Sequence, residues 1–202
     1  MKQLTACLSA IVLLASCSEG KKKVIIISEG TANVNTDDRT ITTSGRGHEE
    51  KTVMFYGDGS MDLKVTSPAG NATVTLADNG VYFLNTKKDT IVGSFVNYTA
   101  PKKSTKTISD AEMQQNIDSL ELILSGKVQT GKTYFILPNQ AVKITANDGA
   151  TIITPYHQMT SIEVKPGETP EVYRFYPISE TRATLEKLKG MMGIGDKPVN
   201  EK

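Results

Sequence analysis

The sequence contains no tryptophan, and only two cysteines and two histidines occur among its 202 residues. Sugar rings are usually held by stacking on tryptophan and tyrosine, so the missing tryptophan counts against a glycan-binding platform without excluding one. Two cysteines, Cys7 and Cys17, are too few for a disulfide framework or a cysteine-based metal site. Neither histidine lies in an H-E-x-x-H motif or a comparable zinc-ligand spacing. The residues therefore predict no metal and no cofactor.

An excess of charge of either sign is missing as well. Lysine and arginine number 23 against 22 aspartates and glutamates, which gives a formal net charge of +1 at pH 7. A protein that binds nucleic acid through its phosphates usually carries a clear excess of basic residues. The balance predicts that nucleic acid is not a partner.

The chain starts with a long apolar segment. Lys2 is followed by apolar residues from Leu4 to Ala15, broken only by Thr5 and Ser9. This segment is shorter than the roughly 20 apolar residues that a membrane-spanning helix needs, and polar residues follow soon after it. It is typical of the hydrophobic region of an export signal.

The end of this segment, Leu14-Ala15-Ser16-Cys17, resembles the lipobox of bacterial lipoproteins, in which a peptidase cuts before the cysteine. The resemblance implies that residues 1–16 are removed and that Cys17 is the lipidation site, which attaches the chain to a membrane. Several acyl chains hold a domain on a membrane far more durably than one chain does. In this family an aspartate directly after the cysteine retains the protein at the inner membrane. Ser18 stands there instead, which implies the outer membrane.

Two other interpretations of the N-terminus remain open. One is an ordinary secretory signal with Cys17 as an incidental thiol. The other is an uncleaved membrane helix, which the polar residues after Cys17 disfavour. Cleavage before Cys17 would remove one lysine and no acid, which leaves 22 basic and 22 acidic residues. It would also remove Cys7, so the mature chain would have no thiol except the anchored one.

The rest of the chain is rich in short strand candidates separated by turns of glycine, asparagine and aspartate. Their spacing of about ten residues is typical of antiparallel sheets. The expected fold is mainly β, an antiparallel β-sandwich-like body with one central helix and one C-terminal helix. The expected organisation is a signal peptide at 1–16, a tether at 17–23, a β-rich segment at 24–100, a connector and helix at 101–131, a β-rich segment and C-terminal helix at 132–192, and a disordered tail at 193–202.

Turns between strand candidates are expected at Thr36–Asp38, Gly57–Ser60 and Asp78–Gly80. Asp58-Gly59 between two alternating strands predicts a hairpin, because the tight turn favours positive φ. Asp148–Gly149 and Pro166-Gly167 are expected to form further hairpin turns. The folded part is expected to start with the β-branched strand Val24–Ile27. A later strand is expected at Thr160–Val164, followed by a turn at Pro166-Gly167.

Two segments have helical periodicity. The first runs from Ser109 to about Ser125, with a capping box formed by Ser109 and Glu112 and with Gly126 placed to end it. Its apolar stripe is expected to pack on a sheet, and a helix that binds a partner is the alternative. The stripe consists of Met113, Ile117, Leu120, Ile123 and Leu124. The second helix is expected from Ser179 to about Met192, with Leu185, Leu188 and Met192 as its apolar face.

Three motifs resemble functional sites but lack the required context. Gly126–Thr133 matches the phosphate loop G-x-x-x-x-G-K-[ST], which needs a strand before it and a helix after it, the reverse of the order expected here. Asp58, Ser60 and Asp62 alternate like the start of a calcium loop, whose glycine and distal glutamate are missing. The segment His48-Glu49-Glu50 is interpreted as a solvated loop. The sequence therefore predicts no nucleotide site and no metal site.

No residues are predicted to be catalytic, because the sequence has no G-x-S-x-G motif. A hydrolase would require His48 or His157 within hydrogen-bond reach of a serine and an acid. The aromatic cluster Tyr173, Phe175 and Tyr176, with Tyr156 upstream, is interpreted as core packing in preference to a binding platform, because Tyr173 and Phe175 share a strand face.

Together these features predict a lipid-anchored protein of the bacterial cell envelope. The body is generally similar to small uncharacterised β-rich lipoproteins of the envelope. We expect a non-catalytic interaction or structural role, with an envelope protein as the candidate partner. The alternative is a surface lipoprotein that binds a glycan or peptide ligand, which a concave apolar pocket with convergent polar groups would favour. An envelope hydrolase is the third and least favoured hypothesis.

Overall fold

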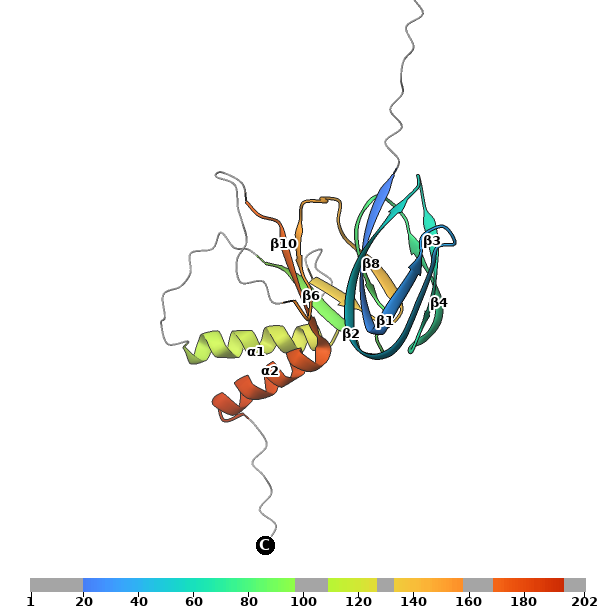
Figure 1. The fold of residues 1–202 in the computed structure, drawn as a ribbon. Coiled ribbons are helices and arrows are strands. Elements are labelled where there is room, and N and C mark those ends of the chain that lie inside the picture. The colour runs from blue at the N-terminus through green and yellow to red at the C-terminus, as the bar shows by residue number, and fades with distance from the viewer. Residues whose placement is uncertain (1–19, 97–108, 127–132, 158–168, 195–202) are drawn as a thin grey trace, which may run out of the picture.

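The computed structural model describes residues 20–96, 109–126, 133–157 and 169–194 (Figure 1). Within these ranges the chain forms ten strands and two helices, so the expected mainly β fold with two helices is confirmed. The strands are β1 (Lys21–Asn35), β2 (Thr40–Tyr56), β3 (Met61–Ser67), β4 (Gly70–Leu76), β5 (Gly80–Asn85), β6 (Ile91–Val96), β7 (Thr133–Ile136), β8 (Gln140–Thr145), β9 (Thr151–Ile153) and β10 (Val172–Pro177). The helices are α1 (Asp110–Leu124) and α2 (Ile178–Met191).

The strands form two sheets, and both sheets mix parallel with antiparallel pairs, so the expectation of purely antiparallel sheets was wrong. Sheet A has the strand order β4-β3-β2-β1-β5-β8, and sheet B has the order β7-β6-β10-β9. The parallel pairs are β1 with β5, β2 with β3, and β9 with β10. Sheet A is nearly barrel-shaped, and sheet B packs against its outer face (Figure 1).

The expected turn at Thr36–Asp38 joins paired antiparallel strands, β1 and β2. The hairpins expected at Gly57–Ser60 and Asp148–Gly149 are not formed. Gly57–Ser60 leads to β3, which pairs in parallel with the first residues of β2. Asp78–Gly80 leads from β4 to β5, whose partners are β1 and β8, and Asp148–Gly149 leads from sheet A into sheet B. A tight turn reverses the chain locally, but it does not determine which strand the next segment pairs with. Sheet A is strongly curled, so the strands that follow these three turns pair with strands other than the one directly before the turn.

Strand β1 begins at Lys21, inside the segment that we expected to be a tether. The Lys22 side chain is fully buried, and its Nζ donates a hydrogen bond of 2.8 Å to the Gly57 carbonyl oxygen. The Gly57 amide donates in turn to the carbonyl oxygen of Gly20, at 2.8 Å. The ordered contacts of the body therefore start only three residues after Cys17.

The β-branched run Val24–Ile27 is buried throughout because both faces of sheet A are covered at β1. Side chains alternate along a strand, so Val24 and Ile26 point into the interior of sheet A, whereas Ile25 and Ile27 point toward sheet B. Strand β5 repeats this division, and all six of its residues are buried. The molecule thus has one core inside sheet A and a second between the two sheets.

Helix α1 begins as the sequence predicts. The Ser109 side chain accepts a hydrogen bond from the Glu112 amide, and the Glu112 carboxylate accepts one from the Ser109 amide. After the helix, Gly126 has φ +66°, a conformation that glycine adopts without strain.

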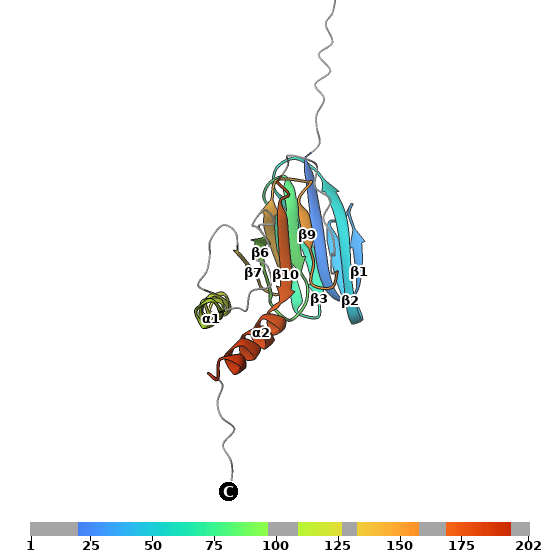
Figure 2. The same cartoon turned by 90° about the vertical axis from the view of Figure 1, so that its left-hand side faces the viewer.

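The two helices lie side by side near one end of sheet B (Figures 1 and 2). An ion pair of 2.8 Å joins Glu121 on α1 to Lys189 on α2. Met113 and Ile117 are buried, but the rest of the α1 stripe is only half-buried. The stripe was expected to pack on a sheet, and instead α1 contacts α2 more extensively than it contacts any strand.

Several expected features lie outside the described residues. They are the signal peptide, the strand at Thr160–Val164, the turn at Pro166-Gly167 and most of the tail. In the part of the chain that the structure describes, no helix has the length and apolar character needed to span a bilayer.

Candidate functional site

A pocket of about 460 Å³ lies between sheet B and the helix pair. Its volume falls within the range that small-molecule sites occupy in other proteins. Four elements line the pocket: β6 with Val92, Gly93 and Ser94, α1 with Leu120 and Ile123, β10 with Arg174 and Tyr176, and α2 with Glu180, Thr181 and Thr184.

Strand alternation directs the side chains of β6 and β10 into this pocket. Phe175 stacks on Phe83 in the core between the sheets, with ring centroids 4.3 Å apart. Its neighbours Arg174 and Tyr176 therefore point the opposite way, toward the helices. Beside them Gly93 has no room for a side chain, because an added Cβ would lie 2.2 Å from Phe175 Cδ1. Strands β6 and β10, which form the floor of the pocket, therefore pack closely against the core between the two sheets.

The apolar part of the pocket comes from Val92, Leu120 and Ile123. Leu120 and Ile123 belong to the apolar stripe of α1 and are half-buried. Because α1 rests mainly on α2, its stripe does not close onto sheet B at this point. These side chains line a concave space that water or a ligand has to fill.

Arg174 is the cationic group of the pocket. Its guanidinium carbon lies 5.0 Å from the centroid of the Tyr176 ring, a distance typical of a cation–π contact. Among the described residues, no ion pair and no hydrogen bond joins the guanidinium to an acceptor, Glu180 included. The five N–H donors of this half-buried side chain are therefore left for water or a ligand.

Helix α2 begins beside the pocket. Its N-cap residue is Pro177, which provides no side-chain hydrogen bond to the first turn. The first amides of a helix lack partners within the helix and carry a partial positive charge. Glu180 and Thr181 lie in this first turn, and the Thr181 side chain is buried whereas that of Glu180 is exposed.

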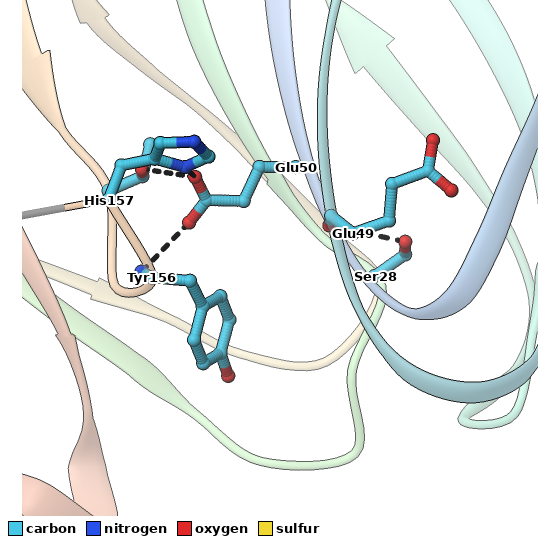
Figure 3. A network of polar contacts seen from close by, with 6 residues as sticks. Ser28, Glu49, Glu50, Tyr156 and His157 are labelled. Atoms are coloured by element: carbon cyan, nitrogen blue, oxygen red, sulfur yellow. Dashed lines mark hydrogen bonds and ion pairs between the residues drawn. The ribbon is translucent and has the colours of Figure 1, made fainter.

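A second cluster of polar side chains centres on Glu50 of β2 (Figure 3). The Glu50 carboxylate accepts hydrogen bonds from the Thr154 hydroxyl at 2.5 Å and from the Tyr156 amide at 2.9 Å. It also contacts Nδ1 of His157. Only 8% of the Glu50 side chain is exposed, so these contacts replace most of its hydration.

His48 belongs to the same cluster. Its ring stacks on that of Tyr156, with centroids 4.3 Å apart and planes 5° from parallel. Lys87 Nζ lies 3.2 Å from Nδ1 of His48 and also contacts the Tyr156 hydroxyl. The interpretation of His48-Glu49-Glu50 as a loop was therefore wrong, because these residues lie in β2. His48 and Glu50 contact the segment that follows β9, whereas the Glu49 carboxylate accepts a hydrogen bond from the Ala32 amide at 2.9 Å.

The Glu50 cluster lacks the arrangement of a serine hydrolase. His157 meets an acid, but in the described ranges neither histidine forms a hydrogen bond with a serine. The nearby Ser28 hydroxyl donates to the Gly30 carbonyl oxygen at 2.8 Å and is buried. Glu50 is already occupied by three donors. These contacts fit a structural role better than nucleophilic catalysis. They form a clasp, in which Glu50 of β2 holds Thr154, Tyr156 and His157 of the chain after β9.

A third group of polar contacts lies at the start of β10. The Glu171 carboxylate accepts hydrogen bonds from Thr145 at 2.6 Å, Tyr173 at 2.7 Å and Asn147 at 2.8 Å. Burial raises the pKa of Glu171, but these hydrogen bonds outweigh burial, and the pKa lies below its usual value. Burial, and then the bond to Glu171, raise the pKa of Tyr173.

The other residues singled out in the sequence take structural positions. The Asp58 carboxylate accepts a hydrogen bond from the Gly20 amide at 2.9 Å, and Asp62 accepts one from Thr75 at 2.6 Å. Tyr173 and Phe175 are buried between the sheets, so the prediction of core packing is confirmed for these two residues. Tyr176 of the same aromatic cluster lines the pocket instead. No group of three or more histidine, cysteine or acidic side chains within the described ranges is placed to hold a metal ion.

The phosphate-loop match has the order of elements that was expected. Helix α1 ends before the motif, at Leu124, and β7 begins at Thr133. Residues 127–132 of the motif, and the predicted lipidation site Cys17, lie outside the described residues. A phosphate loop needs the opposite order, so the flanking elements do not form one.

Of the pocket residues, sequence reasoning singled out Leu120, Ile123 and Tyr176 but favoured core packing for them, and it missed Arg174. Arg174 and Tyr176 alternate with Tyr173 and Phe175, so their common face was readable from the strand pattern. Their juxtaposition with Leu120 was not, because it depends on how α1 sits against α2 and sheet B. Comparisons with protein families, with curated proteins and with solved structures found no match to this chain.

Proposed function

We propose that the mature protein is a lipid-anchored binding protein of the bacterial cell envelope, with no catalytic activity. Its resemblance to the lipobox at Leu14–Cys17 supports lipid attachment through Cys17, and Ser18 supports the outer membrane. The observation that carries the binding role is the pocket between sheet B and the helices.

This pocket favours ligand binding over a purely structural role. It combines an apolar wall from Val92, Leu120 and Ile123 with polar groups that converge from two other elements, Arg174 and Thr181. Small-molecule sites in proteins have this combination, in which the apolar wall provides affinity and a few polar groups orient the ligand. An envelope protein remains a second partner that the same anchored body could contact through another surface.

The lining of the pocket supports binding without catalysis. A hydroxyl nucleophile needs a neighbouring base to accept its proton. The Thr184 hydroxyl donates instead to the backbone carbonyl oxygen of Glu180, at 2.9 Å. Among the described residues that line the pocket, none is a histidine, lysine or cysteine.

The binding role is tested by occluding the pocket. Thr184→Trp places a large side chain among the lining residues and is expected to abolish the binding of fragments that wild type selects from a small-molecule library. Ligand-observed NMR measures this binding, and Lys187→Trp on the exposed side of α2 is the control. Fragments that bind Thr184→Trp as well as wild type would show that the pocket is not the binding site.

The anchor is tested separately, in cells. Cys17→Ala is expected to lose lipid attachment, so that labelling with radioactive palmitate disappears while wild type remains labelled and in the membrane fraction. If Cys17→Ala is labelled and fractionates like wild type, the lipobox interpretation is wrong, whatever the pocket binds.

A further inference from the structure

We propose that the pocket takes a small carboxylate with an apolar body. The carboxylate would lie on Arg174, and the apolar part would lie against Val92, Leu120 and Ile123. This inference rests on the proposed binding function and adds the chemical class of the ligand.

The first step of the argument is the unmatched guanidinium of Arg174. The side chain is half-buried, yet its N–H donors have no acceptor among the described residues. Arginine presents these donors as a planar fork that matches the two oxygens of a carboxylate. A ligand carboxylate would therefore satisfy groups that the described protein leaves to solvent.

The position of Tyr176 supports this orientation. A cation over the face of an aromatic ring interacts through its charge and uses none of its N–H donors. The contact at 5.0 Å restrains the guanidinium at the pocket wall while its donors stay available. Holding the side chain in place before binding lowers the entropy that a ligand has to offset.

The start of α2 adds positive potential at the same wall. Pro177 leaves the first turn without a side-chain cap, while the Ile178 amide donates to the Thr90 carbonyl oxygen at 2.9 Å. The buried Thr181 side chain lines the pocket from this turn. Glu180 opposes this potential, but its side chain is exposed, so water screens its charge more than it screens the half-buried Arg174. The less hydrated part of the pocket therefore favours an anion.

The apolar wall excludes small inorganic anions as the best fit. Val92 lies on β6, and Leu120 and Ile123 lie on α1. Covering these side chains stabilises a complex only when the ligand brings an apolar group that removes them from water. A volume of about 460 Å³ accommodates an aryl or short acyl group beyond the carboxylate. A peptide C-terminus with an apolar last residue presents the same chemistry as a short fatty acid.

The test uses three probes that share one apolar body: 4-phenylbutanoate, its amide and 4-phenylbutylamine. The protein is the chain from Ser18 onward, which contains every described residue, and its amide resonances are followed by NMR during titration. We expect 4-phenylbutanoate to bind at least tenfold more tightly than the amide, because charge-assisted hydrogen bonds are about twice as strong as neutral ones. We expect the amine to bind more weakly than the amide.

Arg174→Gln is expected to remove the preference for the anion while leaving the affinity for the amide within about twofold. The matched control is Arg182→Gln, on the exposed side of α2, which should keep the wild-type preference. Thermal unfolding of both variants shows whether the body is intact, and Arg174→Lys provides a second variant that keeps the charge but loses the fork.

The outcomes separate this inference from the proposed function. If the amide binds as tightly as the anion and Arg174→Gln changes neither affinity, the pocket binds ligands but the carboxylate class is wrong. If the amine binds best, Glu180 determines the ligand, and the class is again wrong. If no probe shifts the resonances of the pocket residues, both the ligand class and the binding role of this pocket are overturned.

Discussion

Glu171 shows how a single residue links the fold to pH. Its hydrogen bonds to Thr145, Tyr173 and Asn147 favour the ionised carboxylate in the folded state and lower its pKa. A group whose folded pKa lies below its unfolded value adds stability above the unfolded pKa and loses that stability as pH falls through the folded pKa.

We therefore expect part of the acid sensitivity of this protein to come from Glu171. Stability should fall as pH drops below about 4.5, the usual pKa of this carboxyl group, and Glu171→Gln should flatten this part of the profile. Urea unfolding at a series of pH values measures the effect. Tyr173→Phe, which removes one donor, should flatten the profile partly, and an unchanged slope in Glu171→Gln would contradict the assignment.

The clasp formed by Glu50 belongs to the scale of elements, because it joins β2 of sheet A to the chain that follows β9. Thr154, Tyr156 and His157 all contact the same carboxylate. Removing the acceptor leaves the half-buried Thr154 hydroxyl and the Tyr156 amide without their partner, and an unsatisfied donor usually costs more than the bond itself contributes.

Glu50→Ala is therefore expected to lower the free energy of unfolding by roughly 2 kcal/mol. The Tyr156 amide should exchange its hydrogen faster in this variant, because its acceptor is gone. Urea unfolding and NMR hydrogen exchange measure the two effects, with Glu186→Ala on the exposed face of α2 as the control. Unchanged exchange at Tyr156 would show that the carboxylate does not hold this segment.

Elements that depend on local chemistry could be predicted from the sequence, and their partners could not. The capping box of Ser109 and Glu112 and the β-branched run Val24–Ile27 each act within a few residues, and both predictions are confirmed. The turn at Gly57–Ser60 was also recognised, but β3 pairs with distant residues at the start of β2. Strand pairing depends on the curl of the whole sheet, which no local pattern contains.

The same limit applies to the candidate sites. Lys87 lies 39 residues from His48 in sequence, and Glu50 lies 104 residues from Thr154. The contacts of the segment His48-Glu49-Glu50 therefore could not be predicted from its local sequence. Arg174 could not be recognised as a site residue from the sequence. Its candidate role depends on the lack of an acceptor for its guanidinium among the described residues, which requires the structure. The alternation of β10 was the one signal available.

For the whole molecule, the early start of β1 determines how the body would sit on a membrane. Two residues, Ser18 and Glu19, separate Cys17 from Gly20, so the distance between Cys17 and Gly20 is at most about 10 Å. Gly20 contacts the turn at Gly57, so this end of sheet A would lie against the lipid surface. The helices lie toward the other end of the molecule (Figure 1). The pocket lies between these helices and sheet B.

This orientation is testable with fluorescent labels on lipidated protein in vesicles. The mature chain has no cysteine besides Cys17, so Ser60→Cys and Ser119→Cys each provide a single free thiol. Energy transfer to an acceptor dye in the lipid headgroups should be clearly stronger from position 60, beside the Gly57 turn, than from position 119 on α1. Equal transfer from both labels would show that the body does not take one orientation.

The strand arrangement also affects how the protein behaves when crowded. Unpaired edges of sheets recruit further strands and so start aggregation, and short edges reduce this risk. In sheet B the edge strands are β7, with four residues, and β9, with three. In sheet A the edges β4 and β8 approach each other. Asn139, directly before β8, accepts a hydrogen bond from the Ser67 hydroxyl at the end of β3 and donates one to the Gly70 carbonyl oxygen at the start of β4. The described edges thus offer little template for polymerisation.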